Sequence, residues 1–196
     1  MVAAPLIGVL ALQGDFEAHS RVLARLGAEV RELRVPADLD GLDGLVIPGG
    51  ESTTMTLGVE REGLAEPLRQ LAARDVPVLG SCAGLIMLDR EHLAIMDMLA
   101  ERNAFGRQSR SFEADLEMGG IEGGPLRGVF IRAPWIAEHG SGVKILAEVE
   151  GHSVAARQGL VTAVAFHTEL GRDDRLHKLF LADVASKSRH DDILTL

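Results

Sequence analysis

The single cysteine of this 196-residue chain, Cys82, lies inside the short apolar stretch 78–86. Gly80 stands two residues before it and Gly84 two residues after it. A nucleophile elbow, which is a sharp turn between a strand and a helix that exposes a reactive side chain, requires small residues at such positions. An elbow would hold the sulfur beside a helix N-terminus, whose partial positive charge favours a thiolate. By itself the pattern leaves two interpretations open, a nucleophile or a small buried core residue.

A nucleophile needs a base, and His167 is the best-placed of seven histidines, most of which we interpret as ordinary surface or helix residues. It follows the apolar run 161–166, so we expect it where a buried strand emerges from a sheet. Glu169 comes two residues later, and the alternation of side chains would place both on one side if the strand continues that far. The carboxylate could then accept a hydrogen bond from one imidazole nitrogen while the other nitrogen faces a nucleophile. Alone the pair also suits a solvated strand end, but together with Cys82 it favours catalysis.

Two adjacent glycines, Gly49 and Gly50, follow the third predicted strand. Glycines there let backbone N–H groups point into a cleft without obstruction, as an oxyanion site requires. With the N–H of Ala83, the residue after the cysteine, they could bind the negative charge that develops on a tetrahedral intermediate. The alternative is a simple turn followed by a helix capped by Ser52 or Thr53. No lysine follows the glycines, which excludes a Walker-type phosphate loop.

Arginines form a fourth group of candidate site residues. A guanidinium can hold a ligand carboxylate through two parallel hydrogen bonds. A single arginine more often only solvates a surface, and spacing alone does not choose among these. The group comprises Arg102, Arg107, Arg110 and Arg132.

The elements that must carry these residues alternate, in the first half of the chain, between strand-like and helix-like segments. The predicted strands are 6–12, 29–35, 44–47 and 76–80, and the predicted helices are 16–26 and 64–71. This alternation is typical of a parallel sheet flanked by helices. In such a fold all strand-to-helix loops emerge at one edge of the sheet, where ligands bind.

The second half changes to short strand-like segments separated by glycine-rich turns. These segments are 112–118, 128–131, 143–149, 153–158 and 161–166. They predict mixed or antiparallel strands added to the sheet, which gives a three-layer α/β fold with a mostly parallel central sheet flanked by helices. A closing helix is expected at 175–185, followed by a polar, frayed tail from about residue 187 to residue 196.

Composition limits the classes of protein to which the chain can belong. A formal net charge of -9 opposes non-specific binding to nucleic acids, which requires an excess of Lys and Arg. The first apolar run, 6–12, is too short to cross a membrane. One cysteine excludes an intramolecular disulfide and, with no basic-then-apolar leader, predicts a cytoplasmic protein. The length predicts one domain spanning 1–196.

Four longer strings of residues carry a resemblance to a known family. They are Pro-Gly-Gly-Glu-Ser-Thr-Thr-Met at 48–55, Gly-Ser-Cys-Ala-Gly-Leu-Ile at 80–86, Glu-Arg-Asn-Ala-Phe-Gly-Arg-Gln at 101–108 and Gly-Val-Phe-Ile-Arg-Ala-Pro at 128–134. With them the chain resembles class I glutamine amidotransferases from about residue 6 to residue 185. More closely, it resembles the glutaminase subunits of pyridoxal 5′-phosphate synthase, the PdxT/SNO family. The elbow is shared across the superfamily, whereas the first and third strings are far more specific to this branch.

The resemblance implies a Cys-His-Glu triad. Cys82 would be the nucleophile, His167 the general base and acid, and Glu169 the group that orients the histidine. The residues that match the family's glutamine site are Gly49, Gly50, Glu51, Arg102, Ile131 and Arg132. The implied reaction is hydrolysis of L-glutamine to L-glutamate and ammonia, with no metal and no cofactor.

The resemblance also implies a partner, a (β/α)8-barrel synthase subunit of the PdxS/SNZ type that receives the ammonia in a large hetero-oligomer. Family members generally need that partner bound before the glutaminase becomes active. Two alternatives stay open: a glutaminase of another amidotransferase, such as imidazole glycerol phosphate synthase, and a non-catalytic regulatory subunit of the same fold. The chain departs from the family at Thr168, where proline is usual, and in the segment 88–99, which is shorter, so no loop contacts are carried over there.

Overall fold

The computed structural model describes residues 3–102 and 111–194, so the predicted string at 103–108 and Arg110 lie outside the described residues. Nine strands of the described chain form a central sheet. They are β1 (Leu6–Leu10), β2 (Glu29–Leu33), β3 (Gly44–Ile47), β4 (Val78–Ser81), β5 (Met98–Glu101), β8 (Trp135–His139), β9 (Lys144–Val149), β10 (His152–Gln158) and β11 (Val161–Val164). β6 (Phe112–Leu116) and β7 (Leu126–Phe130) form a separate two-stranded sheet.

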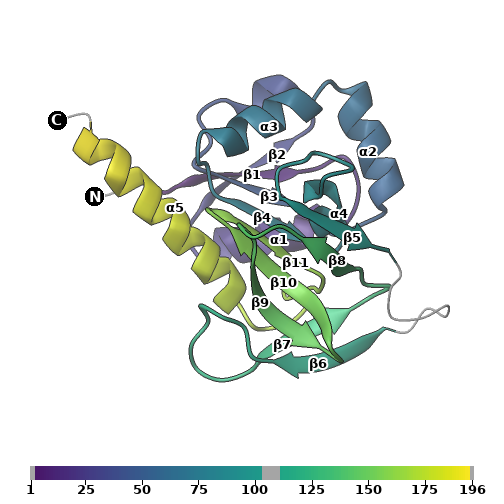
Figure 1. Ribbon diagram of the computed structural model, residues 1–196. Coiled ribbons are helices and arrows are strands. Elements are labelled where there is room, and N and C mark those ends of the chain that lie inside the picture. Colours follow the sequence, from purple (N-terminus) through teal and green to yellow (C-terminus); the bar gives the residue numbers. More distant parts are fainter. Residues whose placement is uncertain (1–2, 103–110, 195–196) are drawn as a thin grey trace.

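Helices cover both faces of the central sheet (Figure 1). They are α1 (Phe16–Arg25), the short 3-10 helix η1 (Pro36–Leu39), α2 (Ser52–Arg61), α3 (Ala65–Ala73), α4 (Ala83–Leu88) and α5 (Arg175–Leu194). α1 and α5 lie on one face, and α2, α3 and α4 lie on the other. In the two described ranges, no helix is long and apolar enough to cross a membrane.

The strand order confirms the predicted α/β fold. It is β2-β1-β3-β4-β11-β10-β8-β5, with β9 paired to β10. The strands from β2 to β11 pair in parallel, whereas β10, β8, β5 and β9 pair antiparallel. A mostly parallel sheet is therefore extended at one side by antiparallel strands, as the change of pattern in the second half of the sequence predicts.

The central strands β3, β4 and β11 are buried along their whole length because helices pack on both of their faces. Gly44 of β3 lies under α5, where an added Cβ would be 2.8 Å from the ring of Phe180. Gly80 of β4 lies under α4, where an added Cβ would be 2.6 Å from Leu88. Close helix packing on these strands fixes the sheet edge from which the candidate site residues emerge.

Two strands and the C-terminal segment differ from the sequence-based expectations. β5 and β8 were not predicted, because they are short and only partly apolar. The predicted frayed tail after residue 186 is wrong, since α5 continues to Leu194 and its end projects beyond the sheet (Figure 1). The segment 186–194 contains no Gly or Pro that would end a helix, and the Ser188 hydroxyl donates a hydrogen bond to the Val184 carbonyl, at 3.2 Å.

Candidate active site

Cys82 lies at the turn between β4 and α4, at the carboxyl end of a central strand. Its φ of 50° and ψ of −106° are rarely adopted by residues other than glycine. The turn is packed tightly, because a Cβ on Gly80 would lie 2.7 Å from the Gly84 carbonyl oxygen. A Cβ on Gly84 would overlap the carbonyl oxygen of Ile47. The glycines are thus a steric requirement, and the predicted strand-turn-helix geometry is confirmed.

A cavity of about 120 Å³ opens beside the Cys82 side chain, which is itself 7% exposed. Besides the cysteine, six residues of the predicted glutamine and oxyanion sites line it: Gly50, Glu51, Ala83, Arg102, Ile131 and Arg132. Two arginines and residues at the starts of α2 and α4 therefore line one small space. Such a lining suits a ligand that carries both a carboxylate and a polarised carbonyl.

Gly49 and Gly50 take different places after β3. Gly49 is not part of the described cavity lining; its Cα lies against the ring of His167, where a Cβ would overlap the ring. The Gly49 carbonyl accepts a hydrogen bond from the Asp15 N–H at 3.2 Å. Because a trans peptide is planar, the N–H of Gly50 points away from Asp15. Of the two glycines, Gly50 is thus the one that lines the cavity.

Glu51 is the N-cap of α2, which corrects the expected alternative of a cap by Ser52 or Thr53. Its carboxylate accepts hydrogen bonds from the Thr54 hydroxyl at 2.7 Å, the Thr54 N–H at 2.8 Å and the Thr53 N–H at 3.0 Å. The Thr54 hydroxyl, followed by these backbone N–H groups, lowers the pKa of Glu51 to about 2. The Glu51 N–H donates to Gln13 Oε1 at 2.7 Å. The Glu51 carboxylate therefore shapes the start of α2 at the cavity wall.

The backbone of His167 is positioned by a different contact from the one that the sequence predicts. β11 ends at Val164, so side-chain alternation does not reach His167. Its backbone is held instead by an antiparallel bridge to Val129 of β7, with hydrogen bonds of 2.8 and 3.1 Å. The ring Nδ1 lies 2.5 Å from Glu169 Oε1 and 2.9 Å from Asp15 Oδ2. The sequence analysis missed Asp15, although its place after the first strand, at the same sheet edge, was an available signal.

The two carboxylates determine the charge of the histidine. Burial lowers the pKa of His167, but interactions with the side chains of Asp15, Cys82 and Glu169 outweigh burial and raise the pKa to about 12. Burial raises the pKa of Glu169, but His19 and His167 hold it well below its usual range. His167 is therefore protonated and Glu169 ionised at neutral pH. Since Nδ1 faces the carboxylates, Nε2 is the nitrogen that can exchange a proton with the Cys82 sulfur.

A buried polar network lies behind the histidine and the carboxylates, and it includes His19 of α1 and His177 of α5, both fully buried. His19 Nε2 lies 2.9 Å from Ser81 Oγ and 3.4 Å from Glu169 Oε1. His19 Nδ1 lies 3.0 Å from His177 Nε2. Burial, and then the neighbouring His19, lower the pKa of His177 to about 4. The network links the two helices of one layer to the carboxylate that orients His167.

These two histidines were not singled out in the sequence analysis. Helical spacing carries the signal that could have found them. His19 lies three and four residues before the buried Val22 and Leu23, on the apolar face of α1. His177 lies three residues before the buried Phe180, on the core side of α5. Both helices thus point a histidine at the core.

Asp15, His19 and Glu169 are the group of metal-ligand side chains within the described ranges whose ligand atoms lie within 4.8 Å of one another. Asp15 Oδ2 and Glu169 Oε1 both face Nδ1 of His167, and both ring nitrogens of His19 contact neighbouring side chains. The other carboxylate oxygens, Asp15 Oδ1 and Glu169 Oε2, are buried and have no hydrogen-bond partner within the described ranges. The contacts that are made connect the group to Nδ1 of His167.

The opposite wall of the cavity comes from the segment after β7 and from the end of β5. The Cys82 thiol lies 3.9 Å from the carbonyl oxygen of Ile131. Arg132, which is exposed, has a φ of 46°, a second strained backbone position at the cavity. Arg102 Nη1 donates a hydrogen bond to Thr53 Oγ1 of α2 at 3.0 Å. Arg102 and Arg132 thus both lie where a ligand carboxylate could reach them.

The chain is similar to known proteins along nearly its whole length. The sequence profile of the SNO glutamine amidotransferase family matches residues 9–186. A protein of Acidothermus cellulolyticus named pyridoxal 5′-phosphate synthase subunit PdxT is 49% identical over 199 residues, which cover 94% of this chain and 96% of that protein. A protein of the same name from Streptomyces griseus is 50% identical over 186 residues, which cover 90% of this chain and 94% of that protein. A crystal structure described as a glutamine amidotransferase is 43% identical with a TM-score of 0.85, covering 91% of this chain and 98% of that one. These matches confirm the resemblance carried by the four strings, and the chain belongs to the SNO glutamine amidotransferase family.

Proposed function

We propose that this chain is a glutaminase that hydrolyses L-glutamine to L-glutamate and ammonia and supplies the ammonia to the synthase subunit of pyridoxal 5′-phosphate synthase. The observation that carries the proposal is the side-chain interaction of Cys82, in a strained elbow, with His167, whose Nδ1 contacts Glu169 at 2.5 Å. The names of the relatives as subunits of that synthase support the assignment of the product's destination.

The first half of the proposed reaction is acyl transfer to the cysteine. The Cys82 thiolate attacks the side-chain carbonyl carbon of glutamine and forms a C–S bond, while N–H groups of Gly50 and Ala83 bind the oxyanion. His167 donates its Nε2 proton to the amide nitrogen, the C–N bond breaks and ammonia leaves. Glu169 and Asp15 keep the Nδ1 proton in place, so the other nitrogen stays directed at the reacting atoms.

The second half releases glutamate. His167, now neutral, takes a proton from water, and the hydroxide oxygen attacks the thioester carbon. The C–S bond then breaks, which returns the Cys82 sulfur and the protonated ring to their starting states. Arg102 and Arg132 are proposed to hold the α-carboxylate of glutamine throughout.

The proposed partner is a (β/α)8-barrel subunit that binds the chain in a hetero-oligomer, and the proposed location is the cytoplasm. A reducing compartment suits the reaction because the nucleophile must stay a free thiol or thiolate, and Cys82 has no second cysteine with which to pair.

The test is the release of ammonia from glutamine by the purified chain, alone and with its cognate synthase subunit. We expect the complex to release ammonia at a rate that Cys82→Ala abolishes, because Cys82 is the thiol of the elbow and the substitution removes the sulfur that forms the acyl intermediate. A Cys82→Ala complex as active as the wild type refutes the assigned chemistry. Affinity capture from the native cell extract identifies the partner, and recovery of a different amidotransferase synthase refutes the assigned destination.

A further inference from the structure

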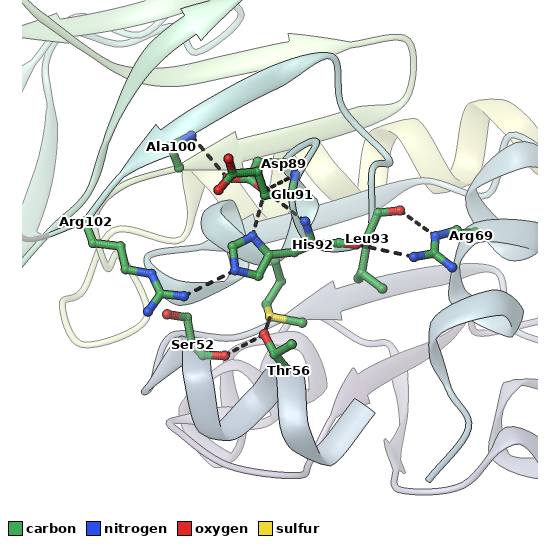
Figure 2. Close-up of polar contacts among 10 residues, drawn as sticks. Ser52, Thr56, Arg69, Asp89, Glu91, His92, Leu93, Ala100 and Arg102 are labelled. Carbon is green, nitrogen blue, oxygen red and sulfur yellow. Dashed lines mark hydrogen bonds and ion pairs between the residues drawn. The ribbon is translucent and has the colours of Figure 1, made fainter. Parts of the chain in front are cut away.

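The loop between α4 and β5, residues 89–97, holds a chain of polar contacts that ends on Arg102 (Figure 2). The chain runs from the carboxylate of Asp89 through the ring of His92 to the guanidinium. We propose that Asp89 and His92 are positioning residues that hold Arg102 over the Cys82 cavity, where it receives the carboxylate of glutamine. The inference rests on the proposed function, because it takes glutamine as the ligand.

Asp89 is the buried end of this series of polar contacts. It directly follows α4 and is 1% exposed, so an ionised carboxylate there must be fully hydrogen-bonded. Oδ1 accepts from the Glu91 N–H at 2.9 Å, the His92 N–H at 3.2 Å and His92 Nδ1 at 2.7 Å. Oδ2 accepts from the Ala100 N–H of β5 at 3.2 Å. Four hydrogen bonds leave the carboxylate one orientation.

The two hydrogen bonds that link Arg102 to Asp89 through His92 are donated in one direction, toward Asp89. A carboxylate only accepts, so Nδ1 of His92 carries the proton that faces Asp89. Nε2 of a neutral ring is then an acceptor, and it lies 3.2 Å from Nη2 of Arg102, which only donates. Asp89 therefore selects the tautomer of His92 that binds a guanidinium.

Arg102 is held from two sides. His92 contacts Nη2, and Thr53 of α2 accepts from Nη1 at 3.0 Å. The guanidinium has five N–H donors, and these contacts use two of them. An exposed arginine held in this way loses less rotamer freedom when a ligand binds, which is the usual benefit of preorganisation. The contacts thus place a cation beside the cavity that Cys82 lines.

A simpler role for His92 would be to brace its own loop, but the backbone of the loop has other supports. Arg69 of α3 donates to the Leu93 carbonyl at 2.8 Å and to the His92 carbonyl at 3.3 Å (Figure 2). The Asp89 carboxylate also accepts from two backbone N–H groups of the loop. The loop therefore keeps these contacts when the His92 side chain is changed.

Two substitutions of His92 separate the positioning role from the bracing role. His92→Asn keeps a donor where Nδ1 faces Asp89 but loses the acceptor that faces Arg102. His92→Gln keeps an acceptor near the place of Nε2 but loses the donor to Asp89. Each variant is assayed as the complex with the cognate synthase subunit, with glutamine as substrate and ammonia as the measured product, after its urea midpoint is compared with that of the wild type.

We expect His92→Asn to raise KM for glutamine about tenfold and to change kcat less than twofold, because a contact made equally in the ground state and the transition state is lost. His92→Gln should restore KM to within about threefold of the wild type, since the acceptor for Arg102 is restored. In an Arg102→Ala background, His92→Asn should change KM no further.

The opposite pattern, with wild-type KM in His92→Asn and a raised KM in His92→Gln, overturns the proposal and assigns His92 to loop bracing. Wild-type KM in both variants overturns it as well, and so does a full additional effect of His92→Asn in the Arg102→Ala background. Failure of the proposed function looks different, because the wild-type complex would then release no more ammonia than Cys82→Ala.

Discussion

His177 of α5 should make the folded protein less stable in acid. Its ring is fully buried, and burial, followed by the neighbouring His19, lowers its pKa from 6.5 to about 4. The unfolded chain binds this proton near pH 6.5, whereas the folded chain binds it only near pH 4, so falling pH favours the unfolded state across this window. The difference of about 2.5 pH units corresponds to about 3 kcal/mol, at 1.36 kcal/mol for each unit.

The perturbation is His177→Gln, which keeps a polar group beside His19 but cannot be protonated. Between neutral pH and pH 4.5, the free energy of unfolding of the wild type should fall by about 2 kcal/mol more than that of the variant. His167 adds little slope below pH 6.5, because a pKa of about 12 leaves it protonated in the folded state, and the stability that it loses between pH 6.5 and neutral pH is common to the wild type and the variant. Glu169, whose pKa is lowered from 4.5, contributes a loss only as pH falls below that value.

The assay is urea unfolding followed by far-UV circular dichroism, at both pH values, for the wild type and the variant. At each pH, the free energy of unfolding of the variant is subtracted from that of the wild type, and the two differences are compared. Any destabilisation by the substitution that does not depend on pH then cancels. His139→Gln is the matched control, because His139 is an exposed histidine on β8. A difference between His177→Gln and the wild type that moves by less than about 0.5 kcal/mol would refute the reasoning.

Three further substitutions test individual contacts of the site. Gly49→Ala places a methyl group against the His167 ring, so kcat for ammonia release by the complex should fall about a hundredfold, and an unchanged kcat would show that the ring has room to move. Asp15→Asn removes one of the two carboxylates at Nδ1, so an NMR titration should show the pKa of His167 below about 12 while Glu169 still supports activity; an unmoved pKa contradicts the contact. Thr168→Val replaces a buried hydroxyl that has no hydrogen-bond partner in the described ranges, and urea unfolding should show a gain of about 1 kcal/mol rather than a loss.

The sequence could predict those parts of the site that depend on local sterics. Gly80 and Gly84 are required because the chain reverses at Cys82 within a few residues, and a Cβ at either position meets backbone atoms. β3 was predicted with its observed bounds because a short apolar run ends at Pro48 and two glycines. In both cases the signal lies in residues that are close to one another in the sequence.

The parts that the sequence did not predict depend on the order of the strands. Asp15 follows β1 and His167 follows β11, and they meet only because β1, β3, β4 and β11 end along one edge. The Glu51 cap was missed because the sequence offers Ser52 and Thr53, which are more favoured capping types than Glu, one and two positions later. Local sequence patterns identify candidate side chains, whereas the order of the strands in the sheet determines which of them contact one another.

Backbone strain is a further feature that residue types do not predict. Cys82 and Arg132 both have positive φ, and both line the same cavity. Glycine at either position would relieve about 1–3 kcal/mol of strain, but it would also remove the thiol or the guanidinium. Neighbouring structure must therefore hold the strain, and the Cys82 N–H donates a 2.8 Å hydrogen bond to the Val164 carbonyl, at the end of β11. Because β11 leads directly to His167, the bond that holds the strained turn also sets Cys82 and His167 at neighbouring strand ends.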